Sequence, residues 1–250
     1  MENTDSPLKK RICYNYFHVP GESEIAQFRF NNAENIGRGL ESIGNRVITP
    51  TYAFQSADEA RDFLNQKNIK ILKSRMTRPF YLTEISLLAG WFSACESFVE
   101  SEYEYLILFE DDMWVNHDDN AANTMIESIL HENLPPDADF INFYTTEGCL
   151  PYYKEEYRVN DLLCTPYNLV CCGMILMTKN AAKKLLEKYR VGISAAIDLE
   201  LFGGHSFGQV IYSLRPEVQA GVFSMWSRNW VGSTIDPEHG KFEAVFFDEE

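Results

Sequence analysis

The chain has 250 residues, of which 45% are hydrophobic and 24% are charged, which is typical of a globular protein and excludes a largely disordered one. The formal net charge is -15, so the surface as a whole repels nucleic acid and anionic lipid. Residues 1–10 are polar and lack the apolar core of a signal peptide, and no apolar run approaches the roughly 18 residues of a membrane span.

Strand and helix patterns alternate along the chain. Strands are expected, in chain order, at residues 11–19, 45–49, 69–72, 105–109, 139–144, 172–177 and 210–214. Helices are expected at residues 57–66, 83–101, 123–130 and 181–189, and Ser56, Thr83 and Thr178 are placed to cap three of them. This alternation predicts an α/β fold with a mostly parallel central sheet flanked by helices. Without a repeat or a flexible linker, we expect a single domain over residues 1–250, with flexible ends at residues 1–10 and 240–250.

Six cysteines are spread along the chain, and none of them forms a C-x-x-C pair. Several lie in apolar runs, as Cys171 and Cys172 do. We therefore expect buried thiols rather than a zinc site, and a reducing compartment rather than a disulfide framework. The expected location is the cytoplasm.

Three consecutive acids, Glu110, Asp111 and Asp112, directly follow the expected strand at residues 105–109. This strand is apolar at every position, so we expect it to be covered on both faces, as central parallel strands are. Ligands bind beyond the carboxyl ends of such strands, and clustered carboxylates repel one another unless a cation compensates them. The cluster therefore predicts a site for Mn²⁺ or Mg²⁺, which prefer oxygen ligands.

Side chains alternate along an extended chain. Glu110 and Asp112 are therefore expected to point to the same side and to hold the cation or a ribose. Asp111 is expected to point the other way, where it anchors the loop or meets the sugar. A solvated acidic turn is the alternative interpretation of the same three residues.

Several segments together point to one family of enzymes. They are residues 86–95 (SLLAGWFSAC), 103–113 (YEYLILFEDDM), 173–186 (GMILMTKNAAKKLL), 210–216 (VIYSLRP) and 233–235 (STI). In combination they resemble glycosyltransferase family 25, the lipopolysaccharide-biosynthesis type that is related to collagen galactosyltransferases. In that family a helix precedes a hydrophobic strand that ends in Glu-Asp-Asp, and a later Asp is matched here by Asp198. Agreement of several segments is more specific than any one of them.

The resemblance implies a GT-A fold and an inverting hexosyltransferase. Such an enzyme moves a sugar from a nucleotide-sugar donor, for example UDP-galactose or UDP-glucose, to a hydroxyl of a glycan, lipopolysaccharide or protein. Glycosyl transfer passes through an oxocarbenium-like transition state, and Mn²⁺ or Mg²⁺ on the donor stabilises the departing diphosphate. Inversion needs one general base, for which we predict Asp198 first and Glu200 second. A helix N-cap is the structural alternative for Asp198.

Further contacts are predicted from residue types. His205 is a candidate third metal ligand, as is His239, with an ordinary surface histidine as the alternative. Arg228 is a candidate for phosphate and Trp230 for stacking on a sugar or base, with core packing near the C-terminus as the alternative. Ser93, from the family's helix segment, and Asp111 complete the predicted donor contacts. Arg29 and residues 9–11 are weaker candidates for phosphate contacts, and for all four a solvated surface charge is the preferred interpretation.

Two positions differ from the family pattern. Ala94 follows Ser93 where the family has a histidine, and Val19-Pro20-Gly21 follows the first strand where the family has an Asp-Arg pair. These differences favour a second hypothesis, a GT-A-fold binding or scaffold protein that has lost turnover. A third hypothesis is another metal-dependent α/β enzyme that acts on phosphates. The sequence names neither the donor sugar, nor the acceptor, nor the oligomeric state.

Overall fold

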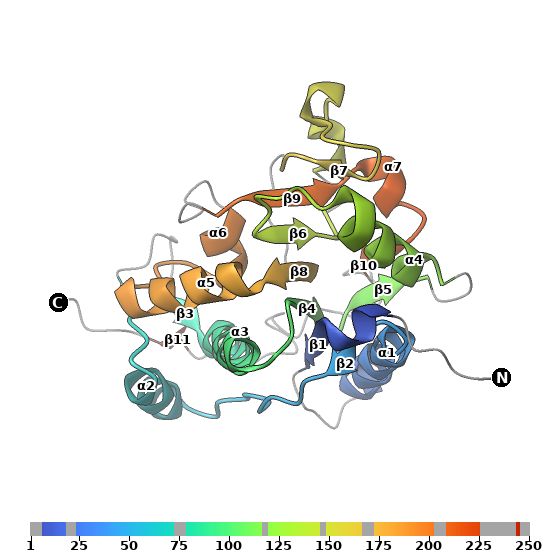
Figure 1. Ribbon diagram of the computed structural model, residues 1–250. Helices are drawn as coiled ribbons and strands as arrows, with labels where there is room; N and C mark the ends of the chain where they lie inside the picture. The colour runs from blue at the N-terminus through green and yellow to red at the C-terminus, as the bar shows by residue number, and fades with distance from the viewer. Residues whose placement is uncertain are drawn as a thin grey trace.

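A seven-stranded mixed sheet runs through the middle of the computed structural model (Figure 1). The structure describes residues 7–18, 24–72, 79–116, 120–145, 149–166, 173–202, 209–225 and 244–245. The strand order is β2-β1-β4-β8-β6-β9-β7. Its members are β1 (Ile12–Phe17), β2 (Asn45–Arg46), β4 (Tyr105–Glu110), β6 (Phe140–Asn142), β7 (Leu163–Cys164), β8 (Met174–Thr178) and β9 (Ile211–Leu214).

Five of the seven strands run in the same direction. β2, β1 and β4 pair in parallel, as do β6 and β9. β8 is antiparallel to both β4 and β6, so these two share one direction, and β7 is antiparallel to β9. The α/β class with a mostly parallel sheet, which was predicted from the sequence, is therefore confirmed.

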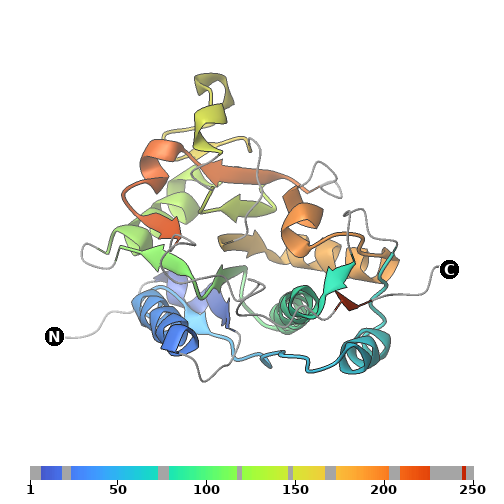
Figure 2. The same cartoon turned by 180° about the vertical axis from the view of Figure 1, so that it is seen from behind.

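Helices cover both faces of this sheet (Figures 1 and 2). They are α1 (Glu24–Leu40), α2 (Ala57–Gln66), α3 (Leu82–Glu100), α4 (Ala121–Ser128), α5 (Lys179–Val191), α6 (Ile197–Phe202) and α7 (Pro216–Gln219). α2, α3, α5 and α6 contribute to the core on one face, and α1 and α4 to the core on the other. In β4, Leu106 and Leu108 belong to the first core, whereas Ile107 and Phe109 belong to the second. The prediction that this apolar strand is covered on both faces is confirmed.

Two antiparallel strand pairs lie outside the main sheet. β3 (Phe80–Tyr81) pairs with β11 (Ala244–Val245), and β5 (Met113–Val115) pairs with β10 (Phe223–Met225). Short helical turns are the 3-10 helices Pro7–Lys10, Leu150–Tyr152 and Glu155–Tyr157 and the π-helical turn Ile129–Asn133. β5 begins directly after the three acids.

Local capping signals position two of the predicted helices. The Ser56 hydroxyl accepts a hydrogen bond from the Glu59 backbone N–H at 3.3 Å at the start of α2. The Thr178 hydroxyl accepts one from the Ala181 N–H at 3.2 Å at the start of α5. These bonds satisfy backbone donors that have no partner within the helix. Both predicted caps are confirmed.

Other local expectations were wrong. Residues 69–72 do not form a strand, because only a single bridge joins Ile71 to Ile193. Thr83 is not a cap, because α3 already begins at Leu82 and the Glu84 carboxylate accepts the Tyr81 N–H at 2.8 Å instead. Residues 7–10, expected within a flexible end, form a 3-10 helix, since Leu8 is fully buried against the core.

The largest omission of the sequence analysis is α1, which spans 17 residues. Its buried positions are Ala26, Arg29, Asn32, Ala33, Ile36, Gly37 and Leu40. They follow the spacing of one helical face, but Arg29, Asn32 and Gly37 interrupt the apolar pattern. A search for apolar periodicity therefore passes over this helix.

In the described part of the chain, none of the helices combines the length and the hydropathy needed to cross a lipid bilayer.

The thiols of Cys13, Cys95 and Cys164 should be unreactive in the folded protein. All three are free and buried, and burial raises the pKa of Cys13 and of Cys164 to about 12 and also raises the pKa of Cys95. Because the thiolate is the nucleophile, iodoacetamide at neutral pH should leave these three unlabelled until the protein is denatured. Mass spectrometry of tryptic peptides measures this, and labelling of any of the three in the native protein would contradict their burial.

Replacement of Gly192 by alanine should destabilise the fold. Gly192 ends α5 with a φ of 147°, and an added Cβ would overlap the Leu72 side chain. Backbone strain and overpacking together should lower the free energy of unfolding by about 2 kcal/mol or more. Gly221→Ala is the matched control, because its Cβ would meet no atom within 4 Å, and its effect should stay within about 0.5 kcal/mol. Equal urea midpoints for the two variants would contradict this packing.

Candidate functional site

The carboxyl ends of β1 and β4 lie next to each other. The helix that follows β1 and the helices that precede β4 lie on opposite faces of the sheet. From β1 the chain continues through α1, which contributes to the core on one face. It reaches β4 through α2 and α3, which contribute to the core on the opposite face. The two strands are parallel neighbours (Figure 1). Open α/β sheets bind their ligands at such a topological switch point, beyond the carboxyl ends of the strands.

The pairing register brings the residues that follow β1 against the acids that follow β4. Phe17, the last residue of β1, pairs with Glu110, the last residue of β4. The Asp111 N–H continues this ladder by donating to the Phe17 carbonyl at 3.1 Å. One residue further on, the His18 ring meets the Asp111 side chain, with 2.7 Å between Nδ1 and Oδ2.

Asp111 is the most enclosed of the three acids. It is 4% exposed, which contradicts the alternative of a fully solvated acidic turn. Its Oδ1 accepts Arg29 Nε at 2.7 Å and lies 2.6 Å from Arg29 Nη2. A buried carboxylate is costly without compensation, and Arg29 and His18 provide it here with charge-assisted hydrogen bonds.

Arg29 was expected to be a solvated surface charge, and this prediction is wrong. Arg29 lies on the inner face of α1 with its side chain 6% exposed, because α1 packs against the turn that carries the acids. Its Nη2 also lies 2.9 Å from Oδ2 of Asp112. A single guanidinium therefore bridges two consecutive carboxylates.

Asp111 and Asp112 do not point in opposite directions, as alternation along a strand would require. The two residues lie in a turn between β4 and β5, so the chain changes direction between them and both carboxylates converge on Arg29. Asn32 lies on the same face of α1 as Arg29 and binds the backbone of the segment that carries the acids. Its side-chain amide donates to the Asp111 carbonyl at 3.0 Å and to the Met113 carbonyl at 2.6 Å.

Glu110 and Asp112 remain partly exposed on either side of the buried Asp111. Their carboxylate oxygens are the type of ligand that Mg²⁺ and Mn²⁺ prefer, so their chemistry fits a divalent cation. Within the described residues, no group of three or more His, Cys, Asp or Glu side chains is arranged to hold a metal ion. The predicted third ligand, His205, lies outside the described residues, as do His239, Arg228 and Trp230.

The predicted general bases both belong to α6. Asp198 is the second residue of this helix, and its side chain lies outside the described part of the structure. Glu200 is 1% exposed, and its Oε1 accepts hydrogen bonds from the Ser194 N–H at 2.5 Å and the Ser194 hydroxyl at 2.8 Å. These bonds tie the segment before α6 to the helix. A catalytic role for either residue stays a prediction.

Ser93, the predicted donor contact on α3, is buried. Its hydroxyl lies 2.8 Å from the Tyr52 hydroxyl, in the segment that leads into α2. A donor contact from Ser93 therefore stays a prediction. His18, Arg29 and Asn32 were missed as site residues, because each reaches the acids through contacts between distant segments. The signal that could have found Arg29 and Asn32 is the helical spacing of α1, read with polar residues allowed on its inner face.

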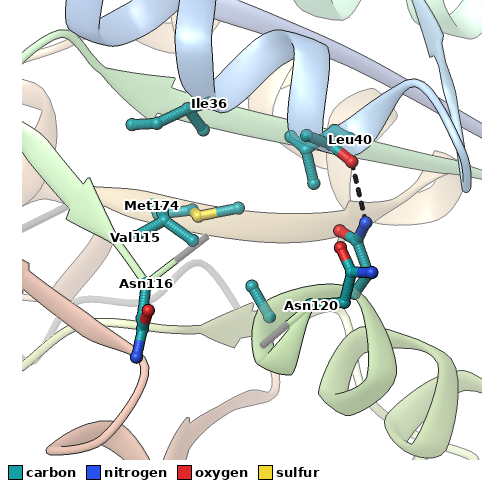
Figure 3. Close-up of a pocket in the computed structure, with 9 residues that line it drawn as sticks. Ile36, Leu40, Val115, Asn116, Asn120 and Met174 are labelled. Atoms are coloured by element: carbon teal, nitrogen blue, oxygen red, sulfur yellow. Dashed lines mark hydrogen bonds between the residues drawn. The ribbon is translucent and has the colours of Figure 1, made fainter. Parts of the chain in front are cut away.

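A small cavity of about 20 Å³ lies between the C-terminal part of α1, the end of β5, the start of α4 and Met174 of β8. Ile36 and Leu40 of α1 face Met174 of β8 across it, and Asn116 and Asn120 lie at its rim (Figure 3). This volume holds about one water molecule. The cavity is therefore too small for a nucleotide sugar.

Comparisons with known proteins give no family assignment. No protein-family model matches the chain, and no curated protein matches it. The similar solved structures include a glycosyltransferase involved in glycosylation of the major capsid of PBCV-1, with 12% identity over 84% of this chain and 98% of that chain and a TM-score of 0.38. Another is a Drosophila β-1,4-galactosyltransferase 7 mutant in complex with manganese, UDP-Gal and xylobiose, with 11% identity over 88% of this chain and 72% of that chain and a TM-score of 0.40. A third is the mannose-1-phosphate geranyltransferase from Thermus thermophilus, with 12% identity over 82% of this chain and 73% of that chain and a TM-score of 0.40. At this level of similarity the matches carry no argument about activity.

Removal of the Asp111 carboxylate should destabilise the protein. Asp111→Ala leaves Arg29 buried with only part of its compensation, which should lower the free energy of unfolding by about 3 kcal/mol. Asp58→Ala removes an exposed carboxylate that pairs with Arg61 on α2, and should cost less than about 1 kcal/mol. Urea unfolding of both variants measures the difference. An Asp111→Ala variant as stable as Asp58→Ala would show that the buried network is dispensable.

Proposed function

We propose that this chain is a glycosyltransferase that moves a sugar from a nucleotide-sugar donor to a hydroxyl acceptor, with inversion at the anomeric carbon. One observation supports this proposal above all. The acids at residues 110–112 lie at the switch point between the carboxyl ends of β1 and β4, where α/β sheets bind ligands. They are held there by buried contacts rather than exposed as a surface turn.

The proposed family is glycosyltransferase family 25. Four of the five segments that resemble it fall on described elements of the α/β fold, and the fifth, residues 233–235, lies outside the described residues. Residues 86–95 lie within α3, residues 103–113 contain β4 and the acidic turn, residues 173–186 contain β8 and the start of α5, and residues 210–216 contain β9. β4 pairs with β8, and α3 packs against α5, so three of the five matching segments share one region of the fold.

Glu110 and Asp112 are the proposed ligands of a divalent cation, Mn²⁺ or Mg²⁺. When bound, such a cation would neutralise the charge that the departing nucleoside diphosphate gains. Asp111 is proposed to act beside them, because Arg29, His18 and Asn32 fix its turn in one conformation before any ligand arrives. A site whose groups are already oriented loses less free energy on binding and reaction.

We assign the general base to Asp198. Inversion requires a carboxylate that can reach the acceptor hydroxyl, and Asp198 lies in the first turn of α6. Glu200 is the second candidate, and its two bonds to Ser194 favour a role in holding α6 in place. Donor contacts from Ser93, Arg228 and Trp230, a metal contact from His205, a UDP-hexose donor, a lipopolysaccharide-type acceptor and a cytoplasmic location all remain part of this proposal.

A second candidate function is nucleotide-sugar binding without turnover. The observation that favours it is the Arg29 guanidinium, which already pairs with both Asp111 and Asp112. Release of the free nucleoside diphosphate separates the two functions. An enzyme releases it from its donor, whereas a binding protein gives calorimetric binding of the donor and no release.

Replacement of Asp112 should abolish sugar transfer. A panel of UDP-, GDP- and CMP-sugars with Mn²⁺ should identify a donor that the wild-type protein cleaves. Asp112→Ala should then lower its release by about 100-fold or more, because the leaving diphosphate loses its cation. Asp161→Ala is the control, because this side chain is 85% exposed and pairs only locally with Arg158.

Circular dichroism of both variants should match the wild type. Full turnover by a folded Asp112→Ala variant would reject the metal role. Donor binding without release by any member of the panel would favour the second candidate function.

A further inference from the structure

Two carboxylates of the acidic turn converge on one cation that belongs to the protein. Arg29 Nη2 lies 2.6 Å from Asp111 Oδ1 and 2.9 Å from Asp112 Oδ2. One of these carboxylates, that of Asp112, is a proposed ligand of a divalent cation. Arg29 therefore sits against the oxygen that the cation would use.

The two contacts of Arg29 are unequal. Asp111 is held through both Arg29 Nε and Nη2, and its second oxygen also meets His18. Asp112 pairs with Arg29 through Nη2 at 2.9 Å, and the Asp112 side chain is 22% exposed against 6% for Asp111. An exchange of partners at the turn is therefore easier at Asp112 than at Asp111.

We propose that Arg29 is a built-in countercation, which balances the acidic turn in the metal-free protein and competes with a divalent cation for the Asp112 carboxylate. On cation binding, Asp112 leaves Arg29 for the cation, whereas Asp111 keeps Arg29. The inference rests on the proposed function in that Asp112 is taken as a cation ligand. It assigns Arg29 as a positioning residue that sets the affinity of the site.

If Arg29 competes with the cation, its replacement should change stability and cation affinity in opposite directions. An arginine with only a structural role would change stability alone. Buried carboxylates without compensation destabilise the fold, so loss of Arg29 should weaken the metal-free protein. The same loss frees an oxygen of Asp112 and removes a positive charge from the vicinity of the cation, which strengthens cation binding. Stability without metal and affinity for metal should therefore change in opposite directions.

The test uses the full chain without any donor, so turnover plays no part in it. Mn²⁺ binding is measured by calorimetry and by electron paramagnetic resonance, and thermal unfolding is followed with and without Mn²⁺. Arg29→Gln should lower the melting temperature of the metal-free protein, lower the Kd for Mn²⁺ by about tenfold or more, and gain more thermal stability from Mn²⁺ than the wild type does. Arg29→Lys keeps the charge but lacks the fork that holds two carboxylates, so its Kd should fall between those of the wild type and Arg29→Gln.

Arg46→Gln is the matched control. Arg46 is exposed and pairs with Glu34 at 2.8 Å and with the Tyr16 hydroxyl at 2.7 Å, and none of these contacts includes residues 110–112. This variant changes the net charge as Arg29→Gln does, and its Kd for Mn²⁺ should equal that of the wild type. A second control is Asp112→Asn in the Arg29→Gln background, which should reverse the gain in affinity. If the gain persists there, the cation binds elsewhere and the inference is overturned.

The remaining outcomes separate the inference from the proposed function. Equal or weaker Mn²⁺ binding by folded Arg29→Gln, with clear binding by the wild type, overturns the competition and leaves the proposed function standing. No Mn²⁺ binding by any variant removes the cation from the proposed function and overturns the inference with it. An Arg29→Gln variant that folds only with Mn²⁺ supports the inference. If it folds under neither condition, Arg29→Lys decides, and an affinity no higher than that of the wild type overturns the proposal.

Discussion

A buried carboxylate is stable only when nearby donors compensate its charge, and the donors that compensate Asp111 come from two other segments of the fold. Arg29 comes from α1, His18 follows β1, and Asp111 itself follows β4. Asn32 adds two hydrogen bonds from α1 to the backbone of the same turn. Because desolvation of an unpaired charge is costly, the turn, the end of β1 and the face of α1 can form only together. The acidic turn is thereby ordered before any ligand binds.

The same interactions hold the proposed site at this edge of the sheet. β4 is covered on both faces by two separate cores. The chain therefore reaches the protein surface again only at the end of this strand, at Glu110. The chain arrives at β4 from one face and leaves β1 toward the other, and α/β sheets bind ligands beyond the strand ends at such a switch point. Partly exposed Glu110 and Asp112 stand on either side of the buried Asp111. Asp111 is therefore buried against Arg29 and His18, whereas its two neighbours reach the surface.

Much of the fold could be predicted from local patterns, and the failures share one cause. The apolar run of β4 and the caps at Ser56 and Thr178 act within a few residues, and they were correctly placed. α1 was missed because the polar residues Arg29 and Asn32 occupy its buried face. Arg29 was expected in solvent because an arginine is usually exposed when no partner for it is known. Polar side chains enter a buried face only when a distant partner satisfies them, and no local pattern shows that partner. Arg29 and Asn32, which interrupt the apolar pattern of α1, are also the residues that bind the acidic turn.

By itself the sequence determined the α/β class, the apolar strand, and the position of three acids at the end of that strand. Each of these follows from side-chain type and spacing within one segment. Only the tertiary structure decided that β8 inserts antiparallel between β4 and β6, that Asp111 is buried, and that Arg29 bridges it to Asp112. Arg29 and Asp111 are 82 positions apart in the chain. Their contact depends on the register of β1 with β4 and on the docking of α1, and neither is encoded in a run of neighbouring residues.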